Sequence, residues 1–425
     1  MQEGTKTING QIFPSSGGFD KGAYYYQFNG TAWTSLLPDE LWDASGAHLT
    51  ANSNRIVYTV YDGAGLVMPL TFFGATWHNW PNAVPSGIKI DNAGCKFGAS
   101  RSHDYSPNSI GPVVSGSSNN QGSLRWYALE PTNGDWNWWT NFDKWVDFHY
   151  SAGRELMYTL FACPPWATSA ADQGSNYIPK ASNPPDSNAD WSDYCSTVAT
   201  RAAGRIKSWD VWNEPNGGNA WFTGTQARYA ELARLAKVAI KAVMPTAVIC
   251  GPCTTGWTQV SVGNAESWTD GALAASDGAG GFGRDHFDAV SVHMYQQTAK
   301  YWDLPRMTAR IRAVMATHGL SAKPLIDSES GFISPLLAQD GPSDPTIWFR
   351  RRLIYMAAAG FHSTYQYDMD GDSMGWLKSN PVRLEGAVKL WNDTVDLLMS
   401  GRITRVNMLW DGTLACIIDG ANVLI

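Results

Sequence analysis

Short apolar segments alternate with amphipathic segments along the chain from about residue 70 to residue 400. The apolar segments have the length of buried strands, and the amphipathic segments carry apolar residues at helical spacing. The predicted strands are 70–77, 96–101, 156–161, 206–212, 247–250, 287–292, 323–327 and 363–367, and the predicted helices are 141–152, 191–203, 225–243, 304–317, 347–359 and 382–398. Eight strands that alternate with helices predict a closed (β/α)8 TIM barrel, an α/β fold, rather than an open sheet.

The helical pattern is clearest in the segment 225–243, which stops before Pro245. The apolar stripe of this helix consists of Leu232, Leu235, Val238 and Ile240. No GxGxxG motif opens any of the predicted helices, which argues against an open dinucleotide-binding sheet as the alternative fold.

The two ends of the chain differ from the central pattern. The N-terminal part contains three consecutive tyrosines at 24–26, an Asn-Gly turn signal at 29–30 and a strand-like run at 55–61. After the last helix, the segments 402–410 and 414–418 predict a hairpin about an Asp-Gly turn. We therefore expect an N-terminal β-strand segment over 1–69, the barrel over 70–400, and C-terminal strands over 401–425 that pack with the N-terminal segment into a small β-module.

The composition narrows the choice of partners. Charged residues make up only 16% of the chain, below the roughly 25% of ordinary soluble proteins, whereas 21 Trp and 17 Tyr are many. Aromatic side chains in a weakly charged protein offer flat surfaces on which sugar rings stack. The alternative for most of these side chains is that they fill the hydrophobic core. The net charge of −7 argues against nucleic acid or an anionic membrane as a main partner. No apolar run has the length of about 18 residues that a membrane span needs.

The six cysteines are too few to form a disulfide framework for a chain of this length. Cys250 and Cys253 have the CxxC spacing of redox sites, but no second CxxC and no nearby His completes a zinc site. Because they follow the apolar run 247–249, we interpret them as part of a buried barrel strand that runs into a turn at Gly251 and Pro252.

Polar residues gather at the carboxyl ends of the predicted strands, where barrel enzymes place their catalytic groups. They are Arg101 and His103 after the second strand, Asn213 and Glu214 after the fourth, His293 and Tyr295 after the sixth, Glu329 after the seventh, and Asp368, Asp370 and Trp376 after the eighth. Glu214 and Glu329 therefore end strands on opposite sides of the predicted ring.

A pair of carboxyl groups is what glycoside hydrolysis requires. One group protonates the leaving oxygen, while the other attacks or stabilises the oxocarbenium-like centre. In the retaining reaction the two groups are about 5–5.5 Å apart, so that the nucleophile reaches the anomeric carbon directly. The acid needs surroundings that preserve its proton, and the nucleophile needs Arg and Tyr hydrogen bonds that keep it ionised.

The segment 212–216, Trp-Asn-Glu-Pro-Asn, resembles the acid/base motif of the clan A glycoside hydrolases, which are barrel enzymes with two catalytic glutamates. The His-x-Tyr at 293–295 and the Ile-Asp-Ser-Glu-Ser-Gly at 326–331 resemble the strand-six and strand-seven segments of the same clan. The Arg-Trp-x-x-Leu-Glu-Pro-x-x-Gly-x-Trp-x-Trp at 125–138 and the Pro-Pro-Trp-Ala at 164–167 are similar to glycoside hydrolase family 39. The resemblance covers about residues 70 to 400.

This resemblance implies a role for each matching residue. Glu214 takes the position of the general acid/base and Glu329 that of the nucleophile. Asn213 takes the place of the Asn that binds the sugar 2-hydroxyl, Tyr295 that of the Tyr that orients the nucleophile, and Arg101 that of the Arg beneath the nucleophile.

Four of the expected sugar-site residues also have ordinary structural explanations. Arg101 is alternatively a structural salt-bridge partner, and His103 is alternatively a surface loop residue. Trp166 and Trp376 are expected to line the sugar-binding cleft, and both are alternatively packed at the rim of the barrel.

The sequence thus predicts a retaining glycoside hydrolase that cleaves an oligosaccharide or polysaccharide by double displacement, without a cofactor. The run Asp368, Asp370, Asp372 resembles the start of a calcium loop, but its glycine is misplaced and no Glu follows, so no metal site is expected. Three alternatives remain open: a non-catalytic glycan-binding protein on the same fold, a phage-tail or surface adhesin module, and a transglycosylase that shares the same residues.

Two further expectations concern substrate and location. Polar loops at 106–123 and 170–190 are predicted on the catalytic face, where long loops either close a pocket or form the walls of a groove. We expect endo-action on a bacterial or plant polysaccharide. A polysaccharide substrate favours an extracellular or periplasmic location, although the first four residues lack the features of a secretory signal. The sequence leaves the sugar and the oligomeric state open.

Overall fold

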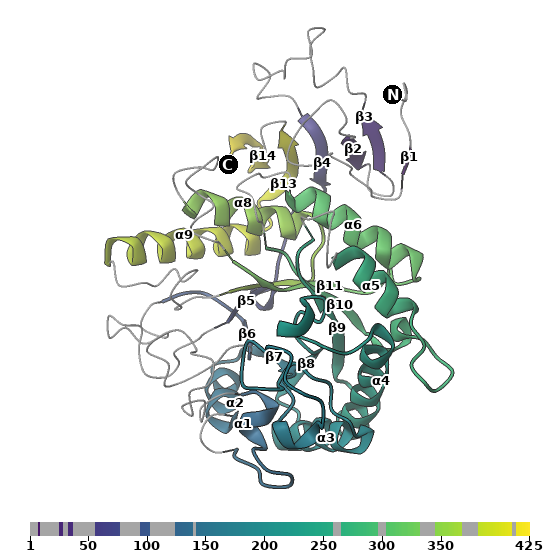
Figure 1. Ribbon diagram of the computed structural model, residues 1–425. Helices are drawn as coiled ribbons and strands as arrows, with labels where there is room; N and C mark the ends of the chain where they lie inside the picture. Colours follow the sequence, from purple (N-terminus) through teal and green to yellow (C-terminus); the bar gives the residue numbers. More distant parts are fainter. Residues whose placement is uncertain are drawn as a thin grey trace.

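The computed structural model describes a barrel and the strands at the two ends of the chain (Figure 1). The described residues are 7–8, 25–28, 33–36, 56–76, 94–102, 124–138, 142–257, 265–295, 303–331, 345–367, 381–409 and 414–425.

Eight parallel strands close into the barrel, as the sequence predicts. Each strand pairs with the next along the chain and the last pairs with the first, so the sheet has no free edge. The strands are β5 (Phe73–Thr76), β6 (Ala99–Arg101), β7 (Glu155–Leu160), β8 (Ile206–Val211), β9 (Val248–Thr254), β10 (Ala289–His293), β11 (Leu325–Ser330) and β12 (Ser363–Gln366).

Helices surround the barrel (Figure 1). The α-helices are α1 (Trp126–Leu129), α2 (Phe142–Ser151), α3 (Asn188–Ala202), α4 (Gln226–Val243), α5 (Ala265–Ala274), α6 (Asp303–Thr317), α8 (Pro345–Ala358) and α9 (Pro381–Met399). Short 3-10 helices are η3 (Leu70–Phe72), η5 (Pro165–Ala167), η6 (Gly218–Ala220) and η7 (Gly283–His286). In the described part of the chain, none of the helices combines the length and apolar character that crossing a membrane requires.

The ends of the longer helices follow local rules. The side chains of Ser187 and Thr225 accept hydrogen bonds from backbone N–H groups in the first turns of α3 and α4, which satisfies donors that have no partner inside a helix. Helix α5 was not predicted from the sequence pattern.

The buried face of α4 differs from the apolar stripe. The residues buried on this helix are Tyr229, Ala230, Leu232, Ala233, Ala236 and Ile240. Val238 is 62% exposed, so this member of the apolar stripe does not face the core. With 3.6 residues per turn, Ile240 returns to the face of Leu232, whereas Val238 points to the far side of the helix.

A layer of apolar side chains fills the barrel below the carboxyl ends of its strands. Its members are Ala99, Met157, Cys250, Ala289, Ile326 and Tyr365. The Tyr365 ring fits because Gly74 lies opposite: a Cβ at Gly74 would be 2.3 Å from the ring. Since alternate residues of a strand share a face, the inward residues two positions further on stand at the open end of the barrel.

Strand β9 extends beyond its predicted end. It continues through Gly251 and Pro252 to Thr254 and pairs there with β10, so the predicted turn is wrong. Gly251 is required by close packing, because a Cβ at this position would lie 2.3 Å from the Phe287 ring. The extension carries Cys253 to the open end of the barrel as a free thiol.

Antiparallel sheets formed by the two ends of the chain lie outside the barrel (Figure 1). The first sheet has the order β15 (Ala421–Leu424), β14 (Leu414–Ile418), β13 (Ile403–Leu409) and β4 (Ile56–Asp62), and the second has the order β1 (Thr7–Ile8), β3 (Trp33–Leu36) and β2 (Tyr25–Phe28). The pairing of β4 with β13 confirms the predicted β-module of N-terminal and C-terminal strands.

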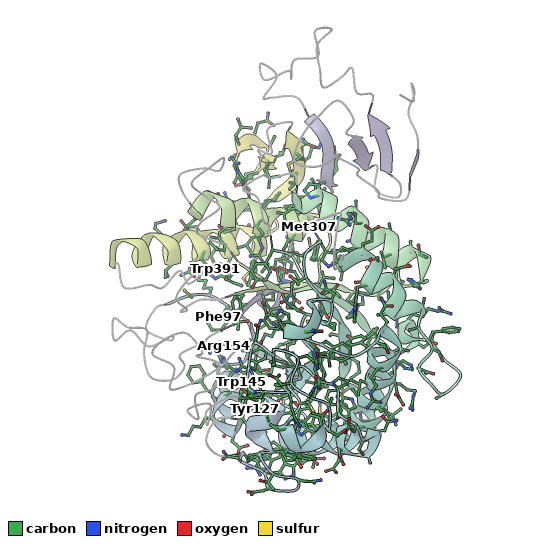
Figure 2. The ribbon with its side chains drawn as sticks, viewed as in Figure 1. Phe97, Tyr127, Trp145, Arg154, Met307 and Trp391 are labelled. Atoms are coloured by element: carbon green, nitrogen blue, oxygen red, sulfur yellow. The ribbon has the colours of Figure 1, made fainter. Side chains whose placement is uncertain are left out.

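Aromatic side chains make contacts near the first strands of the barrel, among them Trp391 and Phe97 (Figure 2). Trp391 of α9 donates a hydrogen bond from Nε1 to the Lys96 carbonyl at 2.7 Å and meets the Phe73 ring edge-on. The Arg154 guanidinium lies 4.1 Å from the centre of the Phe97 ring. The first contact joins α9 to β5 and to the segment that leads into β6, and the second joins this segment to the residue just before β7.

A buried ion pair joins helix α8 to strand β11. Asp327 Oδ2 accepts a hydrogen bond from Arg352 Nη2 at 2.6 Å, and both side chains are at most 1% exposed. Asp327 also accepts from Thr364 Oγ1 of β12 at 2.5 Å and from the Met294 backbone N–H at 3.2 Å. The carboxylate therefore ties together the ends of β10, β11 and β12.

We predict that Arg352→Met lowers the free energy of unfolding by about 3–5 kcal/mol, because it leaves the Asp327 carboxylate buried without its cation. Denaturant unfolding followed by circular dichroism measures this change. As a control, Lys207→Met breaks a partly exposed pair with Glu155 and is expected to cost less than about 1 kcal/mol. An equally small loss in both variants would contradict the importance of the buried pair.

Candidate active site

Glu214 and Glu329 stand at the same open end of the barrel. Glu214 follows the last residue of β8 by three positions, and Glu329 is the penultimate residue of β11. One carboxylate oxygen of each and Nδ1 of His293 all lie within 4.8 Å of one another. The two glutamate side chains are 11% and 6% exposed, so the facing carboxyl groups are largely shielded from water.

The backbone around Glu214 adopts a rare conformation. Trp212 and Glu214 have positive φ angles of 65° and 46°, which cost of order 1–3 kcal/mol at each residue other than glycine. Hydrogen bonds from the neighbouring strand hold this conformation: the Glu214 N–H donates to the Cys253 carbonyl at 3.1 Å. The Asn216 side chain donates to the Thr255 carbonyl at 2.8 Å and accepts from its N–H at 3.0 Å.

Glu329 is held by two donors, Arg101 at the end of β6 and Tyr295 just beyond the end of the neighbouring strand β10. Arg101 Nη1 donates at 2.6 Å and the Tyr295 hydroxyl at 2.8 Å, one to each carboxylate oxygen. Both bonds favour the ionised carboxylate. Burial raises the pKa of Tyr295 well above its ordinary value, and the nearby Glu329 raises it further. The hydroxyl therefore stays protonated and remains a donor.

Arg101 connects Glu329 with the segment that carries Glu214. The buried guanidinium donates from Nε to Asp210 Oδ2 at 3.2 Å and from Nη2 to the side-chain amide oxygen Oδ1 of Asn213 at 3.0 Å. Burial by itself lowers the pKa of Arg101, but the neighbouring Cys253, Glu329 and Asp210 outweigh it and raise the pKa above its ordinary value. The site therefore has a permanent cation beneath Glu329.

The Asn213 side chain carries an unpaired donor. Because its oxygen accepts from Arg101, the amide nitrogen Nδ2 is free to donate elsewhere. Nδ2 is buried and has no hydrogen-bond partner within the described ranges. A buried donor without a partner costs about 1–3 kcal/mol and is rare in folded proteins. The unpaired amide thus indicates where an acceptor of a bound molecule fits.

His293 lies between the two carboxyl groups. Nδ1 is 2.8 Å from Glu214 Oε1 and 3.7 Å from Glu329 Oε1, while Nε2 is 3.1 Å from Cys253 Sγ. Burial by itself lowers the pKa of His293, but Cys253, Glu329 and the hydrogen bond to Glu214 outweigh it and raise the pKa well above its ordinary value. The imidazole therefore presents a proton on Nδ1 to Glu214.

Glu214, His293 and Glu329 also form a group whose atoms are close enough to hold a metal ion. The same atoms already have partners, since the oxygens of Glu329 bind Arg101 and Tyr295 and Nδ1 of His293 faces Glu214. A divalent cation would also face the positive charge of Arg101. The donor set therefore suits proton transfer better than metal binding.

Six of the nine predicted site residues lie together at this end of the barrel. They are Arg101, Asn213, Glu214, His293, Tyr295 and Glu329. Trp166 contacts other residues: its Nε1 donates to the Glu130 backbone carbonyl at 2.9 Å and its ring meets Trp126 edge-on. A sugar contact of Trp166 stays a prediction. His103 and Trp376, like Asp368 and Asp370, lie outside the described residues.

Two buried residues of the site, Asp210 and Cys253, were not predicted. Asp210 accepts from Ser291 Oγ at 2.6 Å and from Arg101, so it supports the buried cation. A signal for Asp210 exists in the sequence, because a carboxylate inside an apolar strand rarely lies in a core without a partner. The sequence offers no such signal for Cys253, whose CxxC spacing pointed to other chemistry.

Comparisons with known proteins agree with this architecture. The family model described as Glycosyl hydrolase family 10 matches residues 109–232, a segment that includes Glu214 and covers less than half of the chain. A glucosidase from Croceicoccus marinus has a TM-score of 0.55 and 15% identity, over 84% of this chain and 73% of that chain. A family 39 glycoside hydrolase from Bacteroides cellulosilyticus has a TM-score of 0.56 and 16% identity, over 84% of this chain and 69% of that chain.

A monomeric beta-xylosidase from Caulobacter crescentus is similar to the same degree, with a TM-score of 0.52 and 14% identity over 83% of this chain and 73% of that chain. At such identities the structural similarity establishes the fold alone. The chain has the TIM-barrel fold of the clan A glycoside hydrolases, which confirms the resemblance indicated by its strand-end motifs.

We predict that the stabilisation contributed by His293 is lost as the pH rises. The folded-state pKa lies above the unfolded value of about 6.5, so the contribution is fully present below about pH 6.5 and disappears as the pH rises through the folded-state pKa. Melting temperatures of the wild type and His293→Gln, compared across pH, measure it. The difference between the two proteins is expected to shrink with rising pH.

His149→Gln serves as a control of opposite sign. Burial and the nearby Arg154 lower the pKa of His149 well below its ordinary value. The contribution of His149 to stability is therefore present above about pH 6.5 and is lost as the pH falls. The same pH trend in both variants would contradict the charge assigned to His293.

Proposed function

We propose that this protein is a retaining glycoside hydrolase, with Glu214 as general acid/base and Glu329 as nucleophile. One arrangement carries the proposal: carboxylate oxygens of Glu214 and Glu329 face each other within 4.8 Å across the open end of the barrel. Retaining enzymes place the two groups about 5–5.5 Å apart, whereas inverting enzymes separate them by about 6.5–9.5 Å. The clan A fold and the family 10 match support a glycosidic bond of an oligosaccharide or polysaccharide as the target.

In the first step, Glu329 attacks the anomeric carbon of the bound sugar. Glu214 donates its proton to the departing glycosidic oxygen, which leaves as an alcohol. A covalent glycosyl ester of Glu329 remains. Arg101 and Tyr295 keep Glu329 ionised and fix its oxygens before the attack, so little reorganisation is needed during the reaction.

In the second step, a water molecule attacks the anomeric carbon. Glu214, now a carboxylate, accepts the proton of this water, and the bonding pair of the ester returns to Glu329. The sugar leaves with its original configuration, and both glutamates regain their starting states. Between the two steps, the proton on Nδ1 of His293 stabilises the Glu214 carboxylate.

Substrate orientation is assigned to Asn213. Its unpaired Nδ2 lies beside the residue that donates the proton and is available to the hydroxyl next to the anomeric carbon. A hydrogen bond to this hydroxyl strengthens in the transition state of glycoside hydrolysis.

We predict that Glu214→Ala and Glu329→Ala both lose hydrolysis of aryl glycosides and polysaccharides that the wild type cleaves, with a loss of at least about a hundredfold for the acid/base. Azide should rescue the two variants with different stereochemistry. It attacks the glycosyl-enzyme of Glu214→Ala and yields a retained azido-sugar, whereas in Glu329→Ala it replaces the nucleophile and yields an inverted one. Product configuration by NMR distinguishes the two.

Wild-type rates in both variants would show that these residues are not catalytic. A panel of glycosides on which the wild type has no activity, combined with binding on a glycan array, would favour the glycan-binding alternative.

We predict that Asn213→Ala lowers kcat/KM by about ten- to hundredfold for an aryl glycoside with a 2-hydroxyl group, since a lost hydrogen bond of about 1–3 kcal/mol corresponds to that factor. For the matching 2-deoxy glycoside, the same substitution should lower kcat/KM only slightly, because this substrate lacks the hydroxyl that Asn213 would bind. Asn407→Ala, at a largely buried asparagine of β13, is the control and should leave both substrates unaffected. Equal losses on the two substrates would argue for a structural role of Asn213.

A further inference from the structure

Cys253 occupies a place at the site that the proposed reaction does not explain. It is the penultimate residue of β9, is completely buried, and has a φ angle of 57°. This left-handed conformation costs of order 1–3 kcal/mol for a residue with a side chain, and it persists only where the surroundings enforce it. The pairing of β9 with β10 is irregular at the same level, between Ser291 and Val292, and such irregularities redirect side chains.

The same residue contacts both the proposed acid/base and its histidine. The carbonyl oxygen of Cys253 accepts a hydrogen bond from the Glu214 N–H at 3.1 Å. Its Sγ lies 3.1 Å from His293 Nε2, while the other ring nitrogen of His293 lies 2.8 Å from Glu214 Oε1. Cys253 therefore supports Glu214 directly through the backbone and indirectly through the imidazole.

We infer that Cys253 is a positioning residue for the acid/base: its thiol holds the far edge of the His293 ring so that Nδ1 stays against Glu214. Cys253 acts through His293 and need not touch the sugar. The inference rests on the proposed function, because Glu214 must transfer a proton for its positioning to affect a rate.

A thiol suits this position because it can both donate and accept a hydrogen bond. The S–H group donates to Nε2 of a neutral imidazole, and the sulfur accepts from the Nε2–H of an imidazolium. Glu214 alternates between acid and carboxylate during the proposed reaction, so the charge favoured on His293 alternates as well. Cys253 can remain a partner of His293 in both states.

Charged and titratable groups on the other sides of His293 determine in which direction its pKa changes when the Cys253 thiol is removed. They are Glu214 and Glu329 at 2.8 and 3.7 Å from Nδ1, Arg101 at 3.4 Å from Nε2, Tyr295 at 6.4 Å between ring centres, and Asp210 at 3.5 Å from the thiol. Without the thiol, Nε2 faces mainly the Arg101 guanidinium. A neighbouring positive charge disfavours the imidazolium, so His293 is expected to lose its proton at lower pH.

Cys250 provides a matched control on the same strand. It is also completely buried, but its side chain lies in the apolar layer inside the barrel, with the Val248 carbonyl 3.8 Å from its Sγ. A substitution of Cys250 changes the packing of β9 without removing a contact to His293.

The first test measures the titration of His293 by NMR in protein labelled with 15N-histidine, with its signals assigned through His293→Gln. In Cys253→Ala the midpoint is expected to fall by about one pH unit or more. Cys253→Ser should restore most of this change, because a hydroxyl also donates and accepts. Cys250→Ala should titrate like the wild type. A midpoint that is the same in Cys253→Ala and the wild type would overturn the inference.

The second test measures kcat and KM against pH. In Cys253→Ala, kcat is expected to fall by about tenfold or more with a smaller change in KM, since misplacing a catalytic group by about 1 Å can cost a hundredfold. The alkaline limb of the kcat profile should move to higher pH. The reason is that the His293 imidazolium, whose positive charge favours ionisation of Glu214, is less populated in this variant.

The outcomes separate the inference from the proposed function. If the wild type is active and Cys253→Ala keeps its kcat and its alkaline limb, the positioning role is wrong while the proposed function stands. If the wild type cleaves no glycoside, the proposed function fails and the acid/base part of the inference fails with it.

Discussion

The site depends on one buried cation, the guanidinium of Arg101. Its planar fork of donors serves Glu329, Asp210 and Asn213 at once, and these acceptors come from two strands and a strand-end segment. A lysine could not reproduce this, because it carries a single point charge. Each buried carboxylate requires compensation for its lost hydration, so the position of Arg101 determines where the acidic groups of the site can lie.

Two supports keep this polar layer in place. Below it, Tyr365 and its apolar neighbours fill the barrel, so no space remains there for the charged side chains. Outside it, Asp327 and Arg352 join the strand that carries Glu329 to helix α8, to β12 and to the backbone of Met294. Met294 lies between His293 and Tyr295, so one buried carboxylate helps to align side chains on two strands.

The two glutamates differ because their partners differ. Glu329 has a permanent cation and a phenol hydroxyl as donors, an environment that suits a nucleophile. Glu214 has a histidine, whose charge can change, and it sits on a backbone in a rare conformation that a neighbouring strand holds. Two carboxyl groups in different surroundings can take the roles of acid and nucleophile at the same pH. Cys253 contributes to this difference from the far side of the imidazole.

The sequence by itself determined the alternation of strands and helices, since buried strands and amphipathic helices have local periodicities, and it placed Glu214 and Glu329 at strand ends. Only the tertiary structure decided that β9 runs through Gly251 and Pro252, because pairing with β10 outweighs the turn preference of that dipeptide. The contacts of Cys253 with His293, and of Asp327 with Arg352, were likewise beyond the sequence pattern. Such contacts join residues far apart in the chain, and they depend on strand register and on closure of the barrel, which no local pattern encodes.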